Sequence, residues 1–119
     1  MRALLLIAVL AAPIAGHAAP YPYTVSGDRF VDMMGRPEPL SSNDYMLREK
    51  AYSYLDGARD SAEGSAWCDV DELKTPDLAY EIAARIAKLP AAQRKKNASR
   101  LILEQLKLLY PCRKTGSGS

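Results

Sequence analysis

Histidine and cysteine are scarce in this chain of 119 residues, which has one His and two Cys. The histidine, His17, lies in an N-terminal segment that we expect to be removed. No imidazole would then remain as a general base, a metal ligand or a pH sensor. Two cysteines are too few for a zinc site. The sequence also lacks a Gly-rich phosphate loop and a distinctive pair of acids at catalytic spacing. We therefore predict no catalytic residue, no metal site and no cofactor.

The first residues have the pattern of a secretion signal. Arg2 gives a short positive start, an apolar run covers residues 3–15, and the small residues Gly16 and Ala18 precede the expected cleavage point. A membrane anchor is the alternative, but it needs about 20 apolar residues. This run is shorter and contains Pro13. We expect residues 1–18 to be a cleaved signal peptide that sends the chain to the periplasm, with no membrane attachment afterwards.

Charge of one sign does not dominate, since 16 Lys and Arg stand against 14 Asp and Glu, a formal net charge of +2. A nucleic-acid-binding domain is usually more basic, so nucleic acid is not an expected partner. The signs are separated along the chain: acids dominate residues 56–81 and bases dominate residues 94–114. This separation is typical of solvated helix faces, and equally of a surface that steers a partner protein.

Apolar residues recur at three- and four-residue steps, which predicts helices and no strands. The first expected helix covers residues 27–34 and follows Ser26 as its cap. The second begins at a cap among Ser41, Ser42 and Asn43 and ends at about Ser61. The third runs from Thr75 to Pro90, and the fourth covers residues 98–109. Thr75 would be an N-cap and Pro76 a first helical residue. Residues 91–97 would form a basic connector. The fold class is all-α, a small bundle of about four helices over residues 19–114, followed by a flexible tail at 115–119.

Gly57 lies inside the second expected helix. Glycine there costs about 1 kcal/mol relative to alanine. We interpret it as a point where another helix crosses closely.

The two cysteines flank the last two expected helices. Cys68 comes before the third helix and Cys112 follows the fourth, so an antiparallel hairpin would bring them to the same end. An exported chain meets an oxidising compartment, where such a pair is expected to be bonded. The sequence therefore predicts a Cys68–Cys112 disulfide that staples the bundle. Trp67, beside it, is expected to pack on that end of the core.

The order of these features resembles the Rap/Tai family of type VI secretion amidase immunity proteins. The matching pieces are the signal, the short first helix with Phe30 and Met34, AYSYLDGARDSAEG, the Trp-Cys pair, Leu89-Pro90 and NASRLILEQLKLLYPC. They cover nearly the whole chain after the signal, although DVDELKTP replaces the Pro-Gly turn that often follows the first Cys. We assign structural roles within these pieces to Tyr54, Gly57, Asp60, Trp67, Pro90 and Pro111.

The resemblance implies an all-helical periplasmic protein that is not an enzyme. It would bind and inhibit a cognate peptidoglycan amidase of the NlpC/P60 Cys-His type, and a homodimer is one expected state because some members are dimers. The alternative is a periplasmic acid-stress chaperone of the small one-disulfide helical kind, which would bind many clients. A small enzyme using Ser, Asp or Lys is disfavoured because nothing in the sequence activates a serine.

Two loops are candidate toxin contacts, since loops between rigid helices project from the surface and are held at both ends. The acidic loop, residues 64–74, would contribute Asp69, Asp71 and Glu72. The basic loop, residues 90–97, would contribute Gln93, Arg94, Lys95 and Lys96. We favour the basic loop, because the disulfide and Trp67 are expected to tie down the acidic one. A contact made by helix faces is the remaining alternative.

Overall fold

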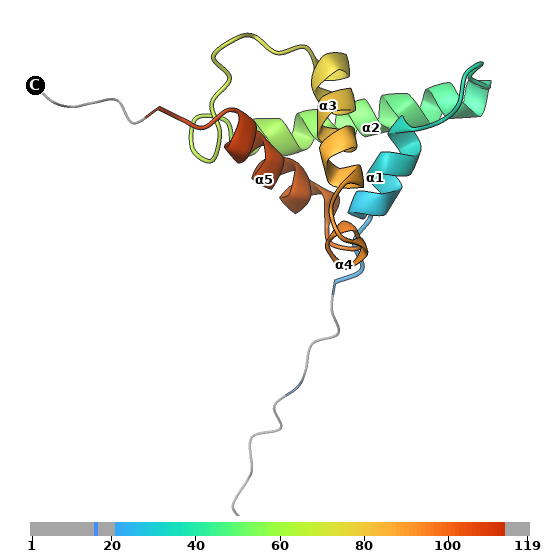
Figure 1. The fold of residues 1–119 in the computed structure, drawn as a ribbon, viewed down its shortest axis with the longest axis horizontal. Coiled ribbons are helices and arrows are strands. Elements are labelled where there is room, and N and C mark those ends of the chain that lie inside the picture. The colour runs from blue at the N-terminus through green and yellow to red at the C-terminus, as the bar shows by residue number, and fades with distance from the viewer. Residues whose placement is uncertain (1–15, 17–20, 114–119) are drawn as a thin grey trace, which may run out of the picture.

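The computed structural model describes residue 16 and residues 21–113. The rest of the expected signal and the tail at 115–119 lie outside the described residues. Five helices and no strand are found in the described part (Figure 1): α1 (Gly27–Met34), α2 (Ser42–Asp60), α3 (Thr75–Ala87), α4 (Ala91–Arg94) and α5 (Ala98–Leu109). The predicted all-α bundle is confirmed. The basic connector contains the single turn of α4.

The first two helices begin at the serines that the sequence offers as caps. The Ser26 hydroxyl accepts a hydrogen bond from the Arg29 N–H, 3.1 Å. Ser41 and Asp44 form a capping box, in which each side chain accepts from the backbone N–H of the other. Asp44 also accepts from Arg36 at 2.8 Å. The bond from Arg36, followed by those from Ser41, lowers the pKa of Asp44 below its usual value.

The start of α3 differs from the prediction by one residue. Lys74 is the N-cap, without a side-chain capping bond, and Thr75 is already helical. The Thr75 hydroxyl donates to Asp56 on α2 and accepts from Arg59 at 3.3 Å. A partner on the neighbouring helix thus replaces the expected capping bond.

The core lies where α3 and α5 pack on α2, with α1 closing the other side. In Figure 1, α3 crosses in front of the long α2, with α5 to one side of it and α1 to the other. The largest fully buried side chains are Trp67, Phe30, Met33, Leu55, Leu78, Ile82, Ile86, Leu101, Ile102 and Leu106. Tyr54 lies at the edge of this core, where its hydroxyl accepts from the Ser99 N–H at 3.1 Å. Tyr54 therefore joins α2 to the start of α5.

Close backbone approach occurs at Gly27 and not at Gly57. A Cβ on Gly57 would meet nothing within 4 Å, so our interpretation of Gly57 as a helix-crossing point is wrong. A Cβ on Gly27 would lie 2.5 Å from Leu101 Cδ1 and 2.7 Å from the Arg94 carbonyl oxygen. The Gly27 N–H also donates to the Lys96 carbonyl at 3.0 Å. The connector before α5 therefore runs directly across the start of α1.

Replacing Gly27 by Ala is expected to lower the free energy of unfolding by about 1–3 kcal/mol, the usual cost of overpacking. Leu101 can shift, but the Arg94 carbonyl belongs to backbone that is bonded to α1. The matched control is Gly57→Ala, which is expected to raise the free energy of unfolding by up to about 1 kcal/mol, since the site is helical and open. Urea unfolding measures both, and a Gly27→Ala variant as stable as the wild type would contradict the close approach.

Candidate binding surface

The disulfide end of the molecule joins the α2–α3 loop to the end of α5. Cys68 and Cys112 are bonded, with Cα atoms 4.7 Å apart, so the predicted disulfide is confirmed. The Cys68 N–H also donates to the Tyr110 carbonyl at 3.0 Å. Burial, together with a 3.0 Å hydrogen bond to Glu81, raises the pKa of Tyr110. Pro111 is exposed between Tyr110 and Cys112, just beyond the last residue of α5.

The side chain of Arg59 holds several residues of the acidic loop in place. Its guanidinium lies 5.5 Å from the centre of the Trp67 ring and donates to the Asp69 carboxylate at 2.9 Å. It also donates to the Leu73 carbonyl at 3.0 Å, farther along the same loop. Trp67 is 1% exposed and donates its indole N–H to the Arg59 carbonyl at 2.9 Å. The sequence reasoning missed Arg59, although a lone arginine inside an acidic stretch was an available signal.

The acidic loop presents only part of its predicted contact set to solvent. The Asp69 side chain is 19% exposed and accepts hydrogen bonds from the Arg59 guanidinium and from the Leu73 N–H. Asp71 and Glu72 are exposed and enter no ion pair with the described residues. Val70 beside them is 63% exposed. Asp69 therefore shapes the loop, while Asp71 and Glu72 are accessible to a partner.

The basic loop is also held in place. Arg94 donates to Asp28 on α1 at 2.8 Å and to the Leu89 carbonyl at 2.6 Å. With the bond from Gly27 to the Lys96 carbonyl, these contacts fix the connector against α1. The side chains of Gln93, Lys95 and Lys96 are exposed. Of the predicted basic contacts, Arg94 is therefore a structural residue of the connector, and the other side chains point to solvent.

The structure does not bring the two candidate loops together. The acidic loop leads into α3 and the basic loop follows it, so they lie at opposite ends of that helix (Figure 1). A helix of 13 residues is about 20 Å long. A single contact confined to one loop therefore leaves the other loop free.

The remaining structural residues lie at helix ends or turns. Asp60 is exposed in the last turn of α2, and Pro90 is exposed and serves as the N-cap of α4. Over residue 16 and residues 21–113, no group of three or more His, Cys, Asp or Glu side chains is placed to hold a metal ion. None of the described helices has the length and apolar character needed to cross a membrane.

Comparison with known families gives the decisive observation. Residues 26–112 match the family of Rap1a immunity proteins, a span that includes every described helix, the disulfide and both candidate loops. The chain belongs to this family. The resemblance stated from the sequence is confirmed. No curated protein sequence is significantly similar to the chain. Membership in this family implies that the chain binds a cognate toxin as its partner.

Proposed function

We propose that this Rap1a immunity protein is exported to the periplasm, where it binds and inhibits a peptidoglycan amidase delivered by a type VI secretion system. The family match over residues 26–112 carries the proposal. The Cys68–Cys112 disulfide supports an oxidising compartment such as the periplasm. Residues 1–18 would be the signal that takes the chain there. The amidase class rests on the resemblance to immunity proteins of type VI amidases.

The proposed mode of inhibition is occlusion of the amidase cleft, without chemistry by this chain. Both candidate loops are held by hydrogen bonds to the helices, as the contacts of Arg59 and Arg94 illustrate. A rigid contact loses less conformational freedom on binding, which favours affinity. We propose the basic loop, through Gln93, Lys95 and Lys96, as the first contact.

A homodimer is part of the same proposal. Tyr45 and Met46 project from α2 and are 57% and 71% exposed. Tyr45, Met46 and Leu47 line one open hollow on α2, and a contiguous exposed apolar patch marks a contact site. The family match favours one specific partner over the many clients of an acid-stress chaperone, because immunity proteins neutralise toxins.

The proposed function is tested by expressing the cognate Cys-His amidase in the periplasm of a bacterial host. Co-expression of the full chain is expected to restore growth to that of the toxin-free host. A matched chain that lacks residues 2–18 should give no protection, because it stays in the cytoplasm. Lysis in the presence of the full chain, at levels where the mature protein is detected, would contradict the proposal. So would peptidoglycan cleavage by the purified chain alone.

A further inference from the structure

Cations without an ion-pair partner among the described residues lie on α3, on α5 and on the connector between them that contains α4. The side chains concerned, called the basic face below, are Arg85, Lys88, Lys95, Lys96, Arg100 and Lys107. None of them forms an ion pair within the described part of the chain. The arginines that do form ion pairs are Arg29, Arg36, Arg48, Arg59 and Arg94. The positive charge of the basic face is therefore not neutralised by acidic side chains of the described residues.

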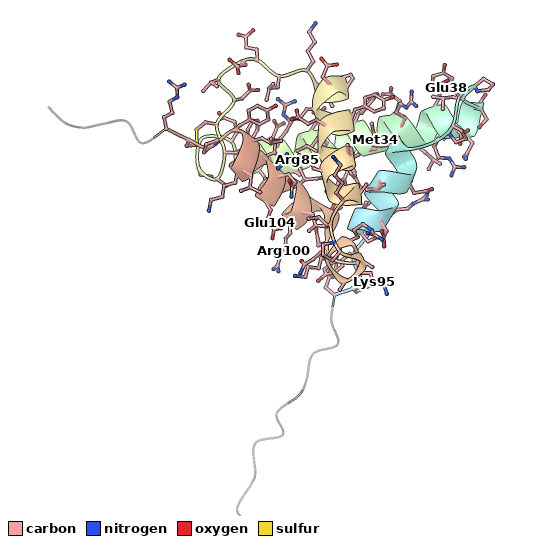
Figure 2. The ribbon with its side chains drawn as sticks, viewed as in Figure 1. Met34, Glu38, Arg85, Lys95, Arg100 and Glu104 are labelled. Atoms are coloured by element: carbon pink, nitrogen blue, oxygen red, sulfur yellow. A yellow bond between two sulfur atoms is a disulfide. The ribbon has the colours of Figure 1, made fainter. Side chains whose placement is uncertain are left out.

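The basic face has a fixed centre between α3 and α5. Arg85 Nε donates to Oε1 of the buried Gln105 at 2.7 Å, which joins the two helices. Arg85 and Gln105, with Lys88, Leu89 and Leu108, line an open hollow of about 310 Å³. Figure 2 shows Arg85 on α3, Glu104 and Arg100 on α5 and Lys95 beyond α4. Glu104 is the acid among these side chains, and it pairs with no described cation.

Leu108 gives the basic face an apolar centre. It is 69% exposed at the rim of the hollow, next to Lys107. The neighbouring apolar side chains of α5, Leu101, Ile102 and Leu106, are at most 1% exposed and already supply the core. An exposed apolar side chain beside cations suits a protein contact, in which the apolar centre is desolvated and the charged rim steers association.

The arrangement also defines the kind of partner. An acidic protein surface would neutralise the cations of the basic face and speed association. An extended polyanion suits the protein less well, because the acidic loop lies beyond the opposite end of α3 and the net charge is only +2. The hollow beside Leu108 has room for an apolar side chain of the partner.

We propose that the basic face is the toxin-docking surface, and that the toxin presents an acidic rim around an apolar side chain that enters the hollow beside Leu108. This inference rests on the proposed function. It extends the first contact from the basic loop onto the solvent-exposed sides of α3 and α5. It assigns Lys88, Arg100, Lys107 and Leu108 to the interface. Arg85 is a positioning residue, since it holds Gln105 and shapes the hollow.

The test uses the cognate Cys-His amidase, inactivated by Cys→Ala in its active site. The Lys88→Glu/Lys107→Glu variant reverses two exposed charges of the basic face and leaves the bond of Arg85 to Gln105 intact. Its matched control, Lys74→Glu/Arg113→Glu, makes the same charge change at exposed cations away from the basic face. Leu108→Ser tests the apolar centre. Affinity and association rate are measured at low and high salt, with circular dichroism confirming that each variant is folded.

We expect the Lys88→Glu/Lys107→Glu variant to bind at least tenfold more weakly at low salt, with a slower association rate. Leu108→Ser should lose at least tenfold in affinity at both salt concentrations, and the control variant should stay within threefold of the wild type. If the wild type binds and the first two variants bind equally well, this inference is overturned while the proposed function stands. An equal loss in the control variant would also overturn it. If the wild type does not bind the amidase, the proposed function fails and this inference fails with it.

Discussion

Replacing Cys68 and Cys112 by alanine is expected to lower the free energy of unfolding by about 4 kcal/mol. The two residues are 44 positions apart, and a cross-link over a loop of that length removes about this much chain entropy from the unfolded state. A small domain has a total stability of about 5–15 kcal/mol, so the loss would be a large share of it. Urea unfolding of the wild type and the double alanine variant measures the difference.

Reduction provides the matched control for this variant. The wild type unfolded in the presence of a thiol reductant should show the same midpoint as the double alanine variant, because both lack the cross-link. The variant itself should be insensitive to the reductant. Identical midpoints for the oxidised and reduced wild type would contradict a stabilising disulfide.

Replacing Trp67 by alanine is expected to cost about 3–5 kcal/mol, the usual range for removing a large buried aromatic side chain. Trp67 is 1% exposed, and its loss leaves both a cavity and an Arg59 carbonyl without its 2.9 Å hydrogen bond. The Arg59 guanidinium, which lies over the ring, would also lose its support. The acidic loop should therefore loosen together with the core.

Trp67→Phe separates packing from hydrogen bonding. Phenylalanine keeps most of the ring contacts but has no N–H donor, so we expect a smaller loss of stability than in Trp67→Ala. Amide hydrogen exchange over residues 64–74 should be faster in the alanine variant than in the phenylalanine variant. A Trp67→Ala protein within about 1 kcal/mol of the wild type would show that the indole does not anchor this end of the core.

The helices could be predicted because their signals are local. The hydroxyl of Ser26 and the serine and acid of the Ser41–Asp44 capping box act within three residues of their own position. Apolar side chains at helical spacing identify the buried faces without knowledge of the partner. The disulfide followed from the positions of Cys68 and Cys112 at the ends of two helices and from the expected oxidising compartment.

The errors at Gly57 and Thr75 have a common physical cause. Whether a glycine is needed, or whether a threonine caps a helix, depends on atoms brought in from another part of the chain. Gly27 is required by the crossing connector and Leu101, and Thr75 is engaged by Asp56. No local pattern reports such contacts.

The binding surface was predictable only in part for the same reason. Composition identified the loops, but it did not show that Arg94 is paired with Asp28, 66 residues away, or that Asp69 is held by Arg59. The basic face requires α3 and α5 to lie side by side, because Arg85 and Leu108 come from different helices. The sequence alone does not identify the basic face, because it does not show which of the other arginines are already paired.

The titration of amidase activity with this chain tests the central claim most directly. Hydrolysis of purified peptidoglycan by the cognate Cys-His amidase is measured as the mature, disulfide-bonded protein is added. The account predicts that hydrolysis falls to the background level once the immunity protein is present in stoichiometric amount. Undiminished hydrolysis in a large molar excess of the folded protein would contradict it.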